Sequence, residues 1–370
     1  MEGECQKAVC GIEVNWVTQS RDYAIADERL NRLAIIDLIG LLCIISCSDD
    51  LYCILTNRCK LIPISNLLLG RCKMAYFWLL LVFFITACGG GGGGGAAPST
   101  VNSTPVATAA TNEPTTSLIV RYGARSEQYG LYKAPSGSGP FPLAVIIHGG
   151  CWNRFIASAS IMQPLADSLT RAGWATLNLE YRVPEDLPYQ AIDTFQDIAT
   201  AMDSLPVMLS NLPVNLKRTV VIGHSAGGHL ALWAGSRASI PTSSLLYKNN
   251  PTLPQAVIGL AAIADLAAYE SQKRFTGCAS NIPKLRGSFA ETEVSPQQMS
   301  AKGVPIYMIS ATGDSIVSAE NSDSYQQQQL KLGNVVNVSK ISGDHFTLIQ
   351  SSGGAFDKIL KIINAVPAAP

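Results

Sequence analysis

Ser225 lies at the centre of a Gly-x-Ser-x-Gly motif, with Gly223 and Gly227 two positions away on either side. An apolar β-branched run precedes the motif, and a helix-like run, residues 230–234, follows it. This pattern predicts a strand, a tight turn and a helix, with the serine at the apex of the turn. Small flanking residues let strand and helix approach, while the turn holds its central residue in a strained backbone conformation. The residue types therefore indicate nucleophilic chemistry at the Ser225 hydroxyl.

A serine hydroxyl is a poor nucleophile unless a base, itself oriented by a third group, activates it. The chain has four histidines. We expect the His224 side chain to point away from the neighbouring hydroxyl, His229 to pack within the following helix, and His148 to belong to a different loop. His345 lies in a small-residue loop after the last predicted strand, and we therefore expect it to be the base.

Two aspartates are candidates for the acid that orients the base. Asp314 and Asp265 each follow a predicted strand, and either carboxylate could stabilise a charged imidazole. We favour Asp314, because Gly313 gives a tight turn directly after its strand. The order along the chain is then Ser225, Asp314, His345, which is the serine, acid, histidine order of one fold family.

Acyl transfer also needs hydrogen-bond donors for the oxyanion that develops in the transition state. The backbone N–H of Ala226, at the start of the predicted helix, supplies one donor. The exposed backbone of Gly149 or Gly150, just after the apolar run 143–147, supplies the other. Losing one such donor typically costs roughly 3–4 kcal/mol of transition-state stabilisation.

Apolar runs typical of strands alternate with helix-like stretches from residue 118 onward. The first two strands are expected to form a hairpin, and the alternation predicts an α/β fold with a mostly parallel central sheet and helices on both faces. Active sites of such sheets lie at the carboxyl ends of the strands, so Ser225, the 148–150 loop and Asp314 should converge there. The expected strands are 118–122, 128–133, 143–147, 174–181, 219–222, 256–263, 305–310 and 335–341. The expected helices are 161–172, 189–205, the run after Ser225 and one that ends with 326–332.

Residues 1–73 have the pattern of neither a domain nor a linker, and we expect them to be untranslated or unstructured; a small membrane-associated segment is the alternative. They hold seven of the ten cysteines, but no C-x-x-C pair and no histidine, which argues against a zinc site. Residues 74–88 join a short apolar core to Ile-Thr-Ala-Cys, as in a lipoprotein signal peptide with a lipobox. We therefore expect translation to begin between about Leu67 and Met74, and Cys88 to be lipidated.

Residues 89–117 are a glycine homopolymer followed by small and polar residues, which predicts a flexible tether. The catalytic domain is expected over residues 118–366. A lipid on Cys88 would hold it in the bacterial cell envelope after export, and Gly89 in the next position favours the outer membrane. The formal net charge of zero does not favour nucleic acid as a partner. Neither a metal nor an organic cofactor is expected.

Residues 118–365 resemble the α/β-hydrolase superfamily, in the branch of small-molecule esterases that carry an H-G-G-x-W loop. Kynurenine formamidases, feruloyl and acetyl esterases and the hormone-sensitive lipase group are similar. The stretches that carry the resemblance are His148-Gly149-Gly150-Cys151-Trp152, Glu180-Tyr181-Arg182, Gly223 to His229, Ser295-Pro296 and Gly313-Asp314. The resemblance implies a triad of Ser225, Asp314 and His345, oxyanion donors at Gly149, Gly150 and Ala226, and Trp152 near the acyl pocket. Two features depart from the usual pattern of this esterase branch. They are Cys151 in the loop and residues 310–313, which precede the candidate acid Asp314.

These features predict a serine ester hydrolase, a carboxylesterase acting on small or medium acyl esters through an acyl-enzyme. An arylformamidase with the same machinery is the alternative, and a non-catalytic surface lipoprotein that kept the fold is a second one. Cys151 and Cys278 are the only cysteines after Cys88. Since an exported protein meets an oxidising compartment, we hypothesise a disulfide between the 148–152 loop and the irregular stretch 267–303, a candidate lid.

Overall fold

The computed structural model describes residues 116–272 and 276–369, together with four short strands between residues 35 and 63. The chain divides into two units, Met1–Ser103 and Thr104–Pro370. The first unit contains one antiparallel sheet, whose strand order is β1 (Ile35–Asp37), β2 (Leu41–Ile45), β3 (Leu51–Leu55) and β4 (Leu61–Pro63). The sequence pattern predicts no element there. The predicted signal peptide, Cys88 and the tether up to residue 115 lie outside the described residues and stay predictions.

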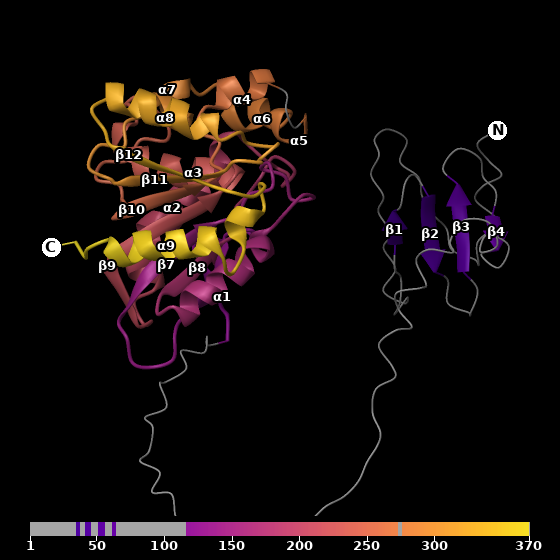
Figure 1. The fold of residues 1–370 in the computed structure, drawn as a ribbon, viewed down its shortest axis with the longest axis horizontal. Coiled ribbons are helices and arrows are strands. Elements are labelled where there is room, and N and C mark those ends of the chain that lie inside the picture. The colour runs from indigo at the N-terminus through magenta and orange to yellow at the C-terminus, as the bar shows by residue number, and fades with distance from the viewer. Residues whose placement is uncertain are drawn as a thin grey trace, which may run out of the picture. The chain divides into compact units, whose positions relative to one another are not determined.

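The second unit is built on an eight-stranded sheet with the order β12-β11-β10-β9-β7-β8-β6-β5 (Figure 1). The six strands from β12 to β8 in this order are parallel, while β6 pairs antiparallel with β8 and β5 antiparallel with β6. The strands are β5 (Leu118–Arg121), β6 (Tyr129–Lys133), β7 (Phe141–Ile147), β8 (Ala175–Leu179), β9 (Val214–His224), β10 (Ala256–Leu260), β11 (Ile306–Ala311) and β12 (Val336–Ile341).

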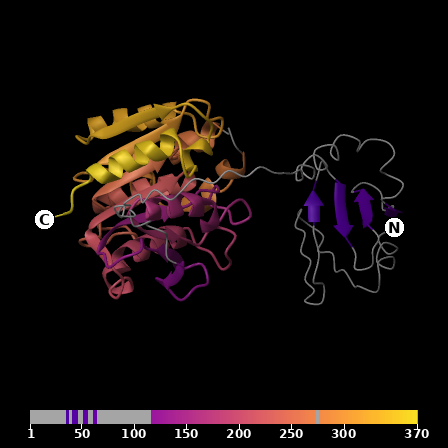
Figure 2. The same cartoon turned by 60° about the horizontal axis from the view of Figure 1, so that its bottom comes forward.

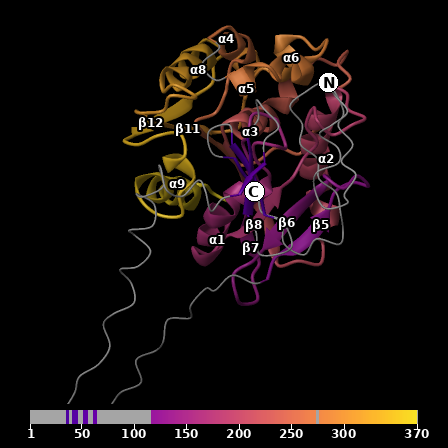
Figure 3. The ribbon, with the colours of Figure 1, turned by 90° about the vertical axis from the view of Figure 1, so that its right-hand side faces the viewer.

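Helices cover both faces of this sheet (Figure 2). Figure 3 shows α1 and α9 on one face and α2, α3 and α8 on the other. The helices are α1 (Gln163–Arg171), α2 (Ile192–Met208), α3 (Ala226–Ser236), α4 (Leu266–Gln272), α5 (Thr276–Ala279), α6 (Ile282–Arg286), α7 (Glu291–Val294), α8 (Glu320–Lys331) and α9 (Gly354–Ala365). None of the helices in the described part of the chain is long and apolar enough to cross a membrane.

The core lies where the central strands are sandwiched between these helix layers. All five residues of the run 143–147 in β7 are completely buried, as are all five of β10. Burial on both faces explains why these strands read as continuous apolar runs instead of alternating ones. Since β7, β9, β11 and β12 run in parallel, the loops that follow them leave the same edge of the sheet. The loop after β7 begins at His148. The loops after β9, β11 and β12 carry Ser225, Asp314 and His345.

The predicted α/β architecture is confirmed, with small differences at the strand ends. The strand before Ser225 begins at Val214, five residues before the predicted start at residue 219. β10 ends at Leu260, and Ala261 has a positive φ of 44°, so residues 261–263 leave the strand. The stretch 267–303, called the cap segment below, folds into α4 to α7 and a short 3₁₀ turn rather than an irregular loop.

Candidate active site

Ser225 occupies the turn between β9 and α3, with φ 56° and ψ −119°. This left-handed conformation is strained for a residue with a side chain, as predicted for the apex of the motif. Its backbone N–H donates to the carbonyl of Leu260 at 2.8 Å, which ties the turn to the neighbouring strand. A Cβ on Gly223 would overlap the carbonyl of Gly227, and one on Gly227 would overlap the carbonyls at the end of β7. Both glycines are therefore needed for the close packing of α3 on the sheet.

His345 and Asp314 meet on the loops after β12 and β11. The Nδ1 of His345 lies 2.7 Å from Oδ2 of Asp314, and the side chains are 6% and 0% exposed. The other carboxylate oxygen, Oδ1, accepts the backbone N–H groups of Ile316 and Val317 at 2.8 and 2.9 Å. This arrangement orients the carboxylate from its own loop, and the carboxylate in turn orients the imidazole with Nδ1 as donor.

Asp265, the second candidate acid, has a different partner. Its Oδ1 accepts the backbone N–H of Ala268 at 2.9 Å, at the start of α4. Of the two aspartates, Asp314 is the one that contacts His345 in the described part of the chain. The exposed Asp344 accepts the N–H groups of Phe346 and Thr347, which shapes the turn that carries His345.

The loop after β7 lies directly against Ser225. A Cβ built on Gly149 would lie 2.8 Å from the carbonyl oxygen of His224 and 3.1 Å from Cβ of Ser225, so only glycine allows this approach. The backbone N–H groups of Gly149, Gly150 and Ala226 donate no hydrogen bond to any of the residues that the structure describes. These three candidate oxyanion donors therefore have no protein acceptor among the described residues, and Gly149 and Ala226 lie next to the serine.

Glu180 and Tyr181, at the end of β8, hold the start of this loop. His148 Nε2 lies 2.9 Å from Oε1 of Glu180, and the Tyr181 hydroxyl donates to the carbonyl of His148 at 2.7 Å. Burial opposes ionisation of Glu180. Hydrogen bonds from His148 and from the backbone N–H groups of Ala159 and Tyr181 outweigh this effect and lower the pKa of Glu180. The position of Glu180-Tyr181 directly after a strand at the same sheet edge is the sequence signal for this support.

His224 contacts His345, a neighbour that the sequence does not predict. Its Nε2 lies 3.1 Å from the carbonyl oxygen of His345, and the two rings are 4.5 Å apart between centroids. The carbonyl is only an acceptor, so Nε2 of His224 carries the proton. Burial, together with the nearby His345, lowers the pKa of His224 to about 3, and this histidine is neutral at physiological pH. A separation of 121 residues hides this contact from sequence reasoning.

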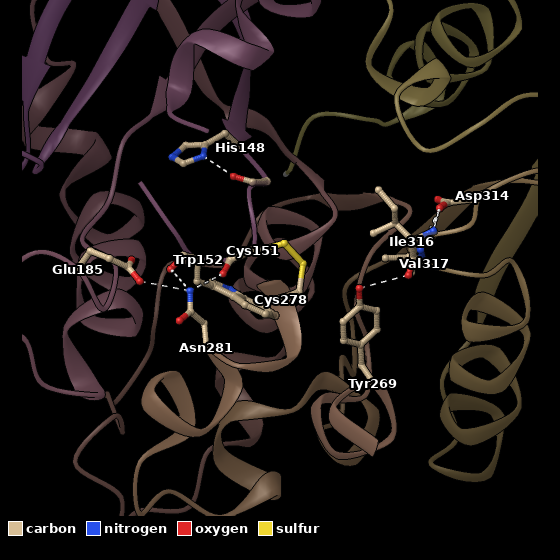
Figure 4. The surroundings of a disulfide bond; sticks show 11 residues. His148, Cys151, Trp152, Glu185, Tyr269, Cys278, Asn281, Asp314, Ile316 and Val317 are labelled. Carbon is tan, nitrogen blue, oxygen red and sulfur yellow. Dashed lines mark hydrogen bonds between the residues drawn. A yellow bond between two sulfur atoms is a disulfide. The ribbon is translucent and has the colours of Figure 1, made fainter. Parts of the chain in front are cut away.

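The hypothesised disulfide between Cys151 and Cys278 is present in the structure (Figure 4). It links the loop after β7 to α5 in the cap segment. Asn281, three residues after Cys278, donates through Nδ2 to the carbonyls of Cys151 and Trp152 at 3.2 and 3.3 Å. At the other side of the site, the Tyr269 hydroxyl of α4 donates to the carbonyl of Ile316 in the acid loop. The cap segment thus contacts both loops that flank the serine turn.

Trp152 is fully buried and packs edge-on against the ring of His229, with 5.3 Å between ring centroids. His229 itself is buried, as expected for a packing residue, and its Nε2 donates to the carbonyl of Val294. The indole N–H of Trp152 has no hydrogen-bond partner in the described residues. Its expected place near an acyl pocket stays a prediction.

A cavity of about 340 Å³ lies beside His148. Neither Ser225 nor His345 belongs to its lining; the charged and ring-bearing lining residues are Glu127, Tyr129, His148, Arg154 and Glu180. Within the described residues, no group of three His, Cys, Asp or Glu side chains has the geometry of a metal site.

The fold agrees with the comparisons with known proteins. Residues 130–329 match the BD-FAE family model, which covers more than half of the chain. The protein therefore belongs to the BD-FAE family of α/β-hydrolases. Esterase LipC of Mycobacterium tuberculosis is 24% identical to it over 200 residues, which is 51% of this chain and 48% of LipC. The chain thus spans about half the length of that relative.

Two solved structures show the same fold. Esterase B from Lactobacillus rhamnosis superposes with a TM-score of 0.58 at 17% identity, over 69% of this chain and 87% of that one. A truncated carbohydrate esterase from gut microbiota superposes with a TM-score of 0.54 at 18% identity, over 69% of this chain and 97% of that one.

Proposed function

We propose that the protein is a serine carboxylic ester hydrolase that acts through an acyl-enzyme. The observation that carries the proposal is the buried contact between His345 and Asp314, on loops that leave the same sheet edge as the Ser225 turn. Membership of the BD-FAE family and the esterase names of the related proteins support the choice of esters as substrates.

The chemistry begins at the Ser225 hydroxyl. Its oxygen attacks the ester carbonyl carbon while His345 takes the hydroxyl proton on Nε2, and Asp314 stabilises the resulting imidazolium through Nδ1–H. Ser225 and His345 form no hydrogen bond with each other in the described residues, and in enzymes without substrate this contact often tightens only on binding. Collapse of the tetrahedral intermediate passes the proton to the leaving alcohol. Water then attacks the acyl-serine with the same base.

The negative charge on the tetrahedral intermediate is stabilised by the free backbone N–H groups. Ala226 donates from the N-terminus of α3, where the helix dipole adds a partial positive charge. Gly149 and Gly150 donate from the loop after β7. Donors that are already held in place need little reorganisation during the reaction, which is why such a site lowers the barrier.

The test is a hydrolysis assay with the purified protein on p-nitrophenyl acetate, butyrate and octanoate and on N-formylkynurenine. The proposal predicts turnover of the short and medium esters, and a fall in kcat/KM of about 10⁴-fold or more in Ser225→Ala. Ser351→Ala, which changes an exposed serine, is the matched control and should behave as the parent. Preferential cleavage of N-formylkynurenine would instead identify a formamidase. Ester turnover that persists in Ser225→Ala would refute the serine mechanism.

A further inference from the structure

The loop after β7 has an unusual backbone. Gly150, Cys151 and Trp152 have φ values of 102°, 59° and 50°, three left-handed residues in a row. The N–H of Asn153 donates to the carbonyl of Gly150 at 2.9 Å, so Cys151 and Trp152 are the central residues of a β-turn. Turns with positive φ at both central positions are normally made by glycine, asparagine or aspartate, because a larger side chain crowds the backbone.

The cap segment supplies the contacts that hold this turn (Figure 4). Cys278 binds Cys151 covalently, and the Asn281 amide donates to both central carbonyls of the turn. Asn281 is almost fully buried and is held in turn by its own N–H, which donates to the carbonyl of Cys278. Cys278 therefore acts on Cys151, and Asn281 acts on both Cys151 and Trp152.

A strained backbone persists only where the surrounding structure holds it in place. Neither Cys nor Trp favours this conformation by itself, so the constraint must come from outside the loop. The strained turn begins directly after Gly149, whose backbone touches the Ser225 turn, and includes Gly150 itself. A relaxation at Cys151 and Trp152 would therefore shift Gly150, which is part of the turn, and through it the adjacent Gly149.

We propose that Cys278 and Asn281 are positioning residues that hold the Gly149–Gly150 backbone N–H groups toward the oxyanion, so that full activity requires the Cys151–Cys278 disulfide. The inference rests on the proposed function and adds redox regulation of the same site. Reduction of the disulfide lowers the activity, while substrate binding is largely kept. The protein would work at its full rate in an oxidising compartment and slowly where thiols are reduced.

The test compares Cys278→Ala and Asn281→Leu with the parent, and Lys284→Ala is the control. Lys284 is an exposed residue of α6 in the same cap segment. For each protein we would measure kcat and KM for p-nitrophenyl butyrate, and Ki for a trifluoromethyl ketone. That inhibitor adds to an active serine and forms an oxyanion. All measurements are made well below the unfolding temperature of the least stable variant.

The proposal predicts that kcat falls by at least about 10-fold in both variants, short of the roughly 10²–10³-fold effect of deleting a donor. The Ki of the ketone should rise by a similar factor, while KM changes little. If the disulfide and the Asn281 hydrogen bonds only stabilise the fold, the two variants would have a lower unfolding temperature. The kcat and Ki of the folded protein would then be unchanged. That second result would overturn the proposal.

Reduction gives an independent measurement that does not depend on a variant folding. Dithiothreitol converts the disulfide to two thiols by two thiol–disulfide exchanges and itself becomes a cyclic disulfide. It should lower kcat of the parent to that of Cys278→Ala, with no further effect on that variant, while circular dichroism shows that the parent stays folded. Full activity of the folded, reduced parent refutes the positioning role. Absence of Ser225-dependent turnover in the oxidised parent would instead refute the proposed function.

Discussion

Asp314 and Asp265 both follow parallel strands, but their carboxylates have different partners. One oxygen of Asp314 faces His345 and the other is held by two backbone N–H groups, whereas Asp265 caps α4. Asp314→Asn removes the negative charge that stabilises the imidazolium and favours the wrong histidine tautomer, so kcat/KM should fall by about 10³–10⁴-fold. Asp265→Asn should change kcat/KM by only a few-fold. Steady-state kinetics of both variants on p-nitrophenyl butyrate checks this, and the reverse ranking would show that Asp265 is the acid.

The positions of the residues expected to do chemistry could be predicted because each follows a strand or a turn with a simple signature. Their partners could not. His224, expected to point away from the serine, contacts His345 across 121 residues of sequence, and Asn281 reaches the loop after β7 across 130. Neither residue type nor spacing contains information about such contacts. The positive φ values of Cys151 and Trp152 are equally hidden, because these residue types disfavour that conformation.

The turn between β9 and α3 works only if the helix packs directly on the sheet. A Cβ on Gly227 would overlap the backbone carbonyls of Ile147 and His148, and backbone cannot move aside as a flexible side chain can. Gly227→Ala should therefore lower the free energy of unfolding by about 1–3 kcal/mol or more and also reduce activity. Gly354→Ala is the matched control in α9, because a Cβ there meets no atom within 4 Å.

Urea unfolding of both glycine variants gives the two free energies directly. Gly354→Ala should be neutral or slightly stabilising, since alanine favours a helix by roughly 0.5–1 kcal/mol over glycine. Equal stability of Gly227→Ala and the parent would contradict the close packing of α3 against the end of β7.

The sheet was predictable from the sequence because its central strands are buried on both faces and form continuous apolar runs. The cap segment was not, because α5 and α7 have only four residues each and show no helical periodicity. The last helix, α9, has a clear apolar face in Ala355, Ile359 and Ile363, all buried against the sheet. No helix is among the elements expected after the His345 loop, although this apolar face is present in the sequence.

The stability of the whole molecule should depend on pH through two buried histidines. Burial lowers the pKa of His224 to about 3 and that of His229 to about 4, from an ordinary value of 6.5. As the pH falls below 6.5, the unfolded chain takes up protons at these positions before the folded protein does, so unfolding becomes more favourable. Each histidine should therefore remove on the order of 1–2 kcal/mol of stability between pH 7 and pH 5.

Urea unfolding at pH 7 and pH 5 measures this loss. His229→Gln keeps a donor for the carbonyl of Val294 but cannot titrate, so its loss of stability should be smaller than that of the parent. Carboxylates whose pKa is lowered, such as those of Glu180 and Asp203, titrate at lower pH. They therefore contribute little to the difference in stability between pH 7 and pH 5. A parent protein equally stable at both pH values would contradict the burial of these two neutral rings.

For the whole molecule, we propose that the fold activates one serine among the many in the chain. Labelling with a fluorophosphonate probe, followed by mass spectrometry of the peptides, tests it most directly, because only an activated serine reacts rapidly with the probe. We expect a single fast adduct on Ser225 in the parent and strongly slowed labelling in His345→Ala. An unlabelled protein, or a fast adduct on another serine, would contradict it.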